Sequence, residues 1–296
     1  MTPRPQPQKV SVRSADVTLV ADAFGDDRNP PVVLLHGGGQ TRHSWAATAA
    51  DLSRQNWYAV TVDLRGHGES GWSADGVYSL DRFAGDVIHI AEFLGRPPVL
   101  VGASLGGNAS LAALGTRQDL ALGLVLVDVS PFLQPSGAGR IRDFMLAHAR
   151  DGFGSLDEAA DHIAAYLPHR PRPRNLEGLR KNLREVDGRW FWHWDPAFLA
   201  SPDDQAVQRN SLTDPARLGA AASTLRIPTL LVRGGKSDVL SIDDAVRFLQ
   251  LVPHAEYASV ADAHHMVAGD DNAVFEQVLW DFLERRVRSR LNVLPA

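Results

Sequence analysis

Short runs of consecutive apolar residues recur along the chain and are separated by longer amphipathic stretches. The runs span residues 31–35, 58–62, 98–101, 122–129, 229–232 and, more weakly, 255–260. Runs of this length are typical of strands that are buried on both faces of a parallel sheet. Residues 9–23 instead alternate apolar and polar side chains, which predicts two antiparallel strands.

Helical patterns lie between these runs. They cover residues 44–55, 80–94, 104–114, 242–251 and 272–291. Strand and helix therefore alternate, and this order indicates an α/β fold in which helices flank a mostly parallel sheet.

The alternation fails once, between residues 129 and 228. That region has no buried strand run, and only amphipathic stretches that contain Pro and Arg, at residues 141–149, 156–166, 176–186 and 207–225. We interpret residues 132–215 as a helical cap, carried by a core made of residues 9–131 and 216–296. Residues 1–8 are expected to be a flexible tail.

Composition removes several classes of chemistry. The chain has 296 residues and no cysteine, which excludes a thiol nucleophile, disulfides and thiolate metal sites. Its net charge is −5, whereas a nucleic-acid partner usually needs a basic excess. The longest apolar run, 120–127, is too short to span a bilayer, and residues 1–9 lack the apolar core of a signal peptide. We expect a cytoplasmic protein with neither a nucleic-acid nor a membrane partner.

A candidate nucleophile lies where the predicted strand at 98–101 meets the following helix. Gly102, Ser104 and Gly106 form the pattern G-x-S-x-G. In this context the pattern predicts a nucleophile elbow, a sharp turn that holds Ser104 above the edge of the sheet. The alternative is a glycine-rich turn whose serine only caps the helix.

Backbone donors for a negative oxygen are expected close by. His36 is followed by three glycines directly after the predicted strand at 31–35. Backbone N–H groups of such a loop can stabilise the oxyanion that acyl transfer creates, and Leu105, the residue after the nucleophile, would supply a second donor. The alternative is a turn in which the glycines only permit tight geometry.

A serine nucleophile needs a base, and the base needs an orienting acid. His264 and His265 follow the last predicted strand, and we prefer His265. Asp238 follows the strand at 229–232, and Asp128 ends the strand before the cap; we favour Asp238 as the acid and keep Asp128 as its rival.

Taken together, these motifs make the chain resemble the α/β-hydrolases over nearly its whole length. It is most similar to the lidded group of small esterases, enol-lactonases, cofactor-free perhydrolases and epoxide hydrolases. The resemblance rests on residues 36–38 with Trp45 downstream, 63–70, the elbow at 102–106, 237–238 and 265–269.

The resemblance implies the α/β-hydrolase fold with an inserted helical cap. Its order of nucleophile, acid and histidine matches Ser104, Asp238 and His265. It also implies backbone oxyanion donors at Gly38 and Leu105, and it implies no metal and no organic cofactor. In relatives the 63–70 segment is a structural loop, so its arginine and histidine are not expected to be catalytic.

Serine at the elbow favours acyl transfer, because epoxide hydrolases and dehalogenases of this fold use an aspartate there. We therefore expect hydrolysis of small apolar carboxylic esters or lactones through an acyl-enzyme. Perhydrolysis of the haloperoxidase-like kind, hydrolysis of carbon–carbon bonds, and a ligand-binding regulatory protein with low turnover stay open, as does the oligomeric state.

Apolar side chains are expected to line the substrate pocket. Trp45 follows the glycine loop, Met266 follows the candidate base, and Trp192 and Trp194 belong to an aromatic segment of the cap. Aromatics at alternate positions more often pack within a core or lid than recognise a ligand. A lid must nevertheless present an apolar face to its active site, so some of these rings are candidates for pocket walls.

Overall fold

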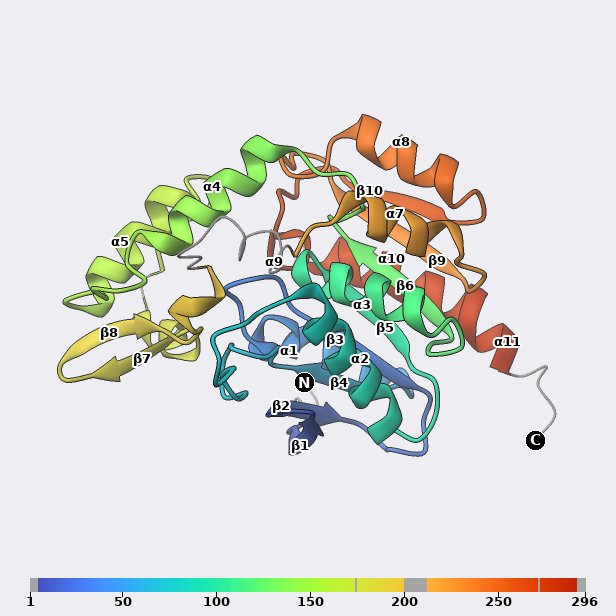
Figure 1. Cartoon of the computed structure of the whole chain (residues 1–296), viewed down its shortest axis with the longest axis horizontal. Coiled ribbons are helices and arrows are strands. Elements are labelled where there is room, and N and C mark those ends of the chain that lie inside the picture. Colours follow the sequence, from blue (N-terminus) through green and yellow to red (C-terminus); the bar gives the residue numbers. More distant parts are fainter. Residues whose placement is uncertain (1–4, 174, 200–211, 271, 292–296) are drawn as a thin grey trace.

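An eight-stranded sheet forms the centre of the computed structural model, which describes residues 5–173, 175–199, 212–270 and 272–291 (Figure 1). Its strand order is β1-β2-β4-β3-β5-β6-β9-β10. The bounds are β1 (Gln8–Ser14), β2 (Val17–Phe24), β3 (Pro31–Leu35), β4 (Tyr58–Val62), β5 (Val99–Ala103), β6 (Gly123–Val127), β9 (Thr229–Gly234) and β10 (Glu256–Val260). β1 and β2 pair antiparallel, β2 pairs antiparallel with β4, and all later pairings are parallel. The predicted α/β class and its mostly parallel sheet are confirmed.

Helices of the core follow the strands as the alternation predicts. They are α1 (Ala46–Arg54), α2 (Leu80–Phe93), α3 (Leu105–Thr116), α7 (Pro215–Ser223), α8 (Ile242–Leu251), α9 (Val267–Asp270), α10 (Asn272–Phe282) and α11 (Ser289–Leu291). The single helix predicted over 272–291 is interrupted by a π-helical segment, Leu283–Arg288, that joins α10 to α11.

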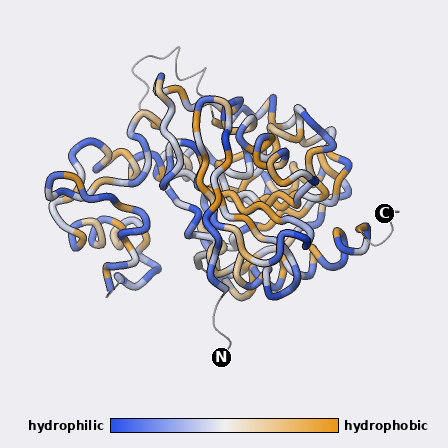
Figure 2. Tube along the Cα trace, turned by 90° about the horizontal axis from the view of Figure 1, so that it is seen from below, coloured by the Kyte–Doolittle hydropathy of each residue, from blue (hydrophilic) through white to orange (hydrophobic). Residues whose placement is uncertain are grey.

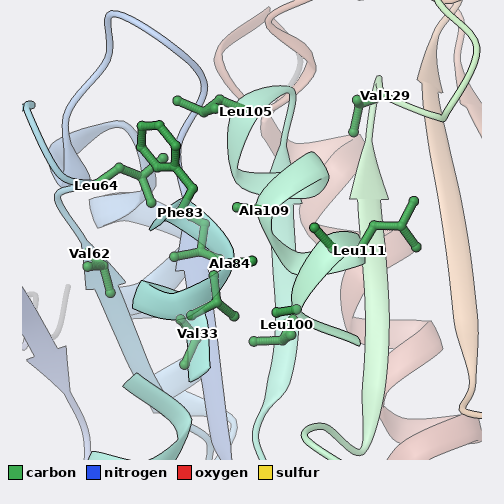
Figure 3. Close-up of a cluster of buried hydrophobic side chains, with 14 of the residues drawn as sticks. Val33, Val62, Leu64, Phe83, Ala84, Leu100, Leu105, Ala109, Leu111 and Val129 are labelled. Carbon is green, nitrogen blue, oxygen red and sulfur yellow. The ribbon is translucent and has the colours of Figure 1, made fainter. Parts of the chain in front are cut away.

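Alternate strand residues point to opposite faces of the sheet, and each face is covered by its own helices. Val33 and Leu35 belong to the cluster that α2, α3, α7 and α8 cover, whereas Val32 and Leu34 belong to the one that α1 and α10 cover. Figure 3 shows the first of these clusters, in which Phe83 of α2 and Ala109 of α3 lie over the strands. Hydrophobic segments are concentrated in the central strands (Figure 2). Burial on both faces explains why these strands read as continuous apolar runs.

The chain leaves the sheet after β6 and returns to it at β9, and the cap lies between them (Figure 1). Its elements are α4 (Pro135–Leu146), α5 (Leu156–Tyr166), a 3₁₀ segment (Leu176–Lys181), β7 (Leu183–Val186), β8 (Arg189–Trp192) and a 3₁₀ turn (Pro196–Phe198). Helices were predicted over 141–149 and 156–166. α5 matches the second range, whereas α4 begins six residues before the first range and ends three residues before its end. Of the stretch predicted over 207–225, residues 207–211 lie outside the described part, and α7 occupies 215–223 against α3.

The prediction of a helix over 176–186 is wrong in its second half. The chain there forms one strand of the hairpin β7–β8. Asp187 and Gly188 join the two strands, with φ of 50° and 77°. Asp-Gly is a favoured pair for a two-residue hairpin turn, because both central residues need positive φ. The cap is therefore not purely helical.

No helix in the described part of the chain is both long and apolar enough to cross a membrane.

Candidate active site

Ser104 sits on a strained turn between β5 and α3. Its φ is +46° and its ψ is −111°, a conformation that side-chain-bearing residues rarely adopt. Its side chain forms no capping bond to the helix, so the alternative of a helix-capping serine is not supported. A Cβ at Gly106 would lie 2.5 Å from the carbonyl oxygen of Leu35, and one at Gly102 would collide with the backbone of Gly107. Glycine is thus required on both sides for the helix to approach the sheet this closely.

His265 is held by Asp128. Nδ1 of His265 lies 2.7 Å from Oδ2 of Asp128, whose side chain is fully buried. The other carboxylate oxygen accepts the backbone N–H of Gly234 at 2.9 Å, and the hydroxyl of Ser237 also donates to Oδ2. Because an ionised carboxylate only accepts hydrogen bonds, Nδ1 carries the proton and Nε2 is left as the basic nitrogen.

Asp238, which the sequence favoured as the acid, lies elsewhere and requires a correction. Its side chain is 43% exposed and pairs with Arg140 of α4 in the cap. A Cβ at Gly137 of α4 would collide with the carbonyl group of Asp238. In the loop after β9, Asp238 therefore contacts helix α4 of the cap. The residue before it, Ser237, donates a hydrogen bond to Asp128.

The two candidate histidines have different surroundings. His265 lines the cavity described below and contacts Asp128, whereas the ring of His264 stacks on that of His169 with centroids 3.7 Å apart. The geometry supports the choice of His265.

Among the described residues, one backbone donor of the glycine loop has no hydrogen-bond acceptor. The N–H of Gly37 donates to the side chain of Gln40 at 3.1 Å, and that of Gly39 donates to Nε2 of His67 at 3.0 Å. In the described part of the chain, the N–H of Gly38 has no partner. Leu105 is the first residue of α3, so its N–H lacks an acceptor within the helix. Both expected oxyanion donors, Gly38 and Leu105, line the same cavity as Ser104.

Two buried histidines fix this loop to the segment at 63–70. His67 receives the Gly39 N–H on Nε2 and has Nδ1 2.9 Å from the carbonyl of Arg65. His36 receives the N–H of Leu64 on Nε2 at 3.0 Å, with Nδ1 2.8 Å from the carbonyl of Gly37. Burial lowers the pKa of both rings, to about 3 for His67, where the nearby His36 adds to the effect. Both are therefore neutral and act as structural supports, as expected for His67.

A cavity of about 860 Å³ lies at the carboxyl ends of the strands, between core and cap. Trp45, Trp192, Trp194 and Met266, the four expected pocket residues, all line it. Its further walls include Phe144, Met145, Phe198, Asn182, Arg142 and Arg170. Trp192 also packs edge-on against Phe153, with ring centroids 5.2 Å apart, so the aromatic segment serves both the core of the cap and the pocket. No sequence pattern singled out Arg142 or Arg170, because arginines are numerous in the cap.

No group of three or more His, Asp or Glu side chains within the described ranges is arranged to hold a metal ion.

Comparisons with known proteins identify the fold and the family. The profile of the α/β hydrolase fold matches residues 30–271. Esterase Rv0045c of Mycobacterium tuberculosis is 29% identical over 264 residues, which cover 87% of this chain and 84% of that protein. Its crystal structure superimposes with a TM-score of 0.73 at 27% identity, covering 95% of this chain and 93% of that one.

Two further relatives differ in what their names describe. The mouse sn-1-specific diacylglycerol lipase ABHD11 is 28% identical, with 95% of this chain and 86% of that protein covered. The crystal structure of E-2-(acetamidomethylene)succinate hydrolase has a TM-score of 0.79 at 22% identity, covers 94% of this chain and all of that one, and shows the shared fold alone. Since the family profile spans most of its length, the chain belongs to the α/β-hydrolase fold family.

Proposed function

We propose that this α/β-hydrolase is a serine hydrolase of small carboxylic esters or lactones, with Ser104, His265 and Asp128 as its triad. The observation that carries the proposal is the hydrogen bond between buried Asp128 and His265 beside a cavity that Ser104 also lines. The related proteins named esterase and lipase support the same class of reaction.

The chemistry follows from the protonation states. The Oγ of Ser104 attacks the carbonyl carbon while Nε2 of His265 takes its proton. Asp128 holds the ring and stabilises the imidazolium that forms. The N–H groups of Gly38 and Leu105 donate to the oxyanion, whose charge they stabilise more strongly than that of the ground-state carbonyl.

Collapse of the tetrahedral intermediate expels the alcohol, which takes the proton from His265. Water then attacks the acyl-enzyme with His265 as the base, and Ser104 is regenerated. The apolar walls favour an apolar substrate body. A cytoplasmic location belongs to this proposal as well.

Covalent labelling tests the proposal directly. The protein should react with a fluorophosphonate at Ser104 and release a burst of 4-nitrophenol from 4-nitrophenyl esters. Ser104→Ala should lose labelling and lower kcat by about 10⁶-fold. A folded wild-type protein that shows neither labelling nor turnover would instead be a binding protein.

A further inference from the structure

The cavity of the proposed active site has an uneven distribution of charge. Its described lining includes Arg142 and Arg170 but neither an aspartate nor a glutamate. The acid of the triad, Asp128, lies behind His265 and is occupied by three hydrogen bonds. Within the described lining, the positive charge of Arg142 therefore faces no acidic side chain.

Arg142 occupies a defined position relative to the reacting groups. Four residues of α4 that share one face of the helix line the cavity: Ala138, Ile141, Arg142 and Met145. Met145 is buried, and a Cβ at Gly39 would lie 2.8 Å from its methyl group. Met145 therefore contacts the glycine loop that carries the Gly38 N–H. Arg142 lies one helical turn from Met145, where side chains three residues apart are neighbours.

The two arginines of α4, Arg140 and Arg142, differ in their partners. Arg140 pairs with Asp238 and does not line the cavity. Arg142 forms neither a hydrogen bond nor an ion pair with any residue in the described ranges. Its guanidinium is exposed and thus remains available to a ligand.

We propose that Arg142 forms a subsite for a carboxylate or phosphate group on the substrate. This inference rests on the proposed function and narrows it to esters that carry an anionic group. A guanidinium binds either group through two parallel N–H donors, which lysine cannot do. The anionic group can belong to the acyl half or to the alcohol half of the ester.

Two matched pairs of substrates separate these sources. For the acyl half, the mono-4-nitrophenyl ester of adipic acid is compared with its methyl ester, which lacks the charge. For the alcohol half, 4-acetoxybenzoate is compared with methyl 4-acetoxybenzoate. The quantity measured is the ratio of kcat/KM for the anionic member to that for the neutral member.

We expect this ratio to exceed one in at least one pair and to fall by about 10- to 100-fold in Arg142→Gln, as loss of a hydrogen bond to a charged group implies. Arg142→Lys should restore only part of it. Added salt should lower the ratio in the wild type, because the arginine is exposed. Arg150→Gln, an exposed cap arginine outside the cavity wall, removes the same charge and should leave the ratio unchanged.

The outcomes are distinguishable. If neutral esters are hydrolysed with no preference for anionic ones, or if Arg142→Gln lowers both members of each pair equally, the anionic subsite is refuted while the serine hydrolase stands. If the folded wild type hydrolyses none of the four esters and no other activated ester, the proposed function itself fails.

Discussion

Asp128 and His265 are 137 residues apart in the sequence, yet a 2.7 Å hydrogen bond joins the carboxylate of one to Nδ1 of the other. Asp128 has a φ of +51° at the end of β6, and its backbone N–H donates to the carbonyl of Val232 at 2.7 Å. The strand end, and not a flexible loop, therefore aims the carboxylate.

Separate substitution of Asp128 and of Asp238 should show which of the two aspartates acts as the acid of the proposed triad. Asp128→Asn should lower kcat by about 10⁴-fold, because an amide cannot hold the same tautomer of His265. Asp238→Asn removes only an exposed pair with Arg140 and should stay within a few-fold of the wild type. Steady-state kinetics with a 4-nitrophenyl ester gives both values. The reverse ranking would return the acid to Asp238.

The difficulty of choosing this acid from the sequence has a physical cause. β6 and β9 are neighbours in the sheet, so a carboxylate after either strand can reach the same point above its edge. The local sequence pattern also favoured residues 237–238, but it is Ser237 that donates to Asp128, whereas Asp238 pairs with Arg140. Whether the end of β6 or the end of β9 places a carboxylate beside His265 depends on the local direction of the backbone. The spacing of apolar residues along the sequence does not encode that direction.

Other parts of the fold could be predicted because they depend on local pattern. Strands buried on both faces produce continuous apolar runs, and the elbow at Ser104 needs its glycines for steric reasons. The hairpin of the cap was missed because its apolar positions were assigned to a helical period, although Asp187 and Gly188 supplied a turn signal. The charge of the cavity wall depends on which face of α4 meets the core, and that is a tertiary property.

His67 should act as a positioning residue for the oxyanion loop. His67→Ala removes the acceptor of the Gly39 N–H, so the loop that carries the Gly38 donor loses its anchor. We expect kcat to fall by up to about 10²-fold with little change in KM, since misplacement of a transition-state donor costs rate rather than binding. His67→Gln can accept the same N–H and should recover part of the rate. A rise in KM with an unchanged kcat would contradict this role.

The same ring should make stability depend on pH. Burial lowers the pKa of His67 from 6.5 to about 3. Between these values the unfolded chain binds a proton that the folded chain excludes, so the free energy of unfolding decreases as pH falls from about 6.5 towards 3. This contribution is complete above pH 6.5, and its slope approaches about 1.4 kcal/mol per pH unit.

Urea unfolding at pH 7, 6 and 5 measures this slope. His67→Gln carries no titrating ring, so the difference in unfolding free energy between wild type and variant should shrink as pH decreases. His36, which burial also keeps neutral, contributes the same sign in both proteins and cancels in the difference. A difference that stays constant with pH would show that His67 is not held neutral.

Close approach of α3 to the sheet should make Gly106 intolerant of any side chain. The Cβ of Gly106→Ala would lie 2.5 Å from the carbonyl oxygen of Leu35, a backbone atom that cannot rotate away. Overpacking of this kind costs about 1–3 kcal/mol or more of unfolding free energy. The displaced helix would also move the Leu105 N–H, so activity should fall together with the melting temperature.

Gly85, inside α2, provides the matched control. A Cβ there would meet no heavy atom within 4 Å, and the backbone is helical. Gly85→Ala should therefore raise the unfolding free energy by about 0.5–1 kcal/mol, because alanine loses less backbone entropy than glycine in a helix. Thermal denaturation of both variants, followed by circular dichroism, should shift the melting temperature in opposite directions. A melting temperature that rises in Gly106→Ala as it does in Gly85→Ala would mean that helix propensity, and not the approach of α3 to β3, decides the effect at Gly106.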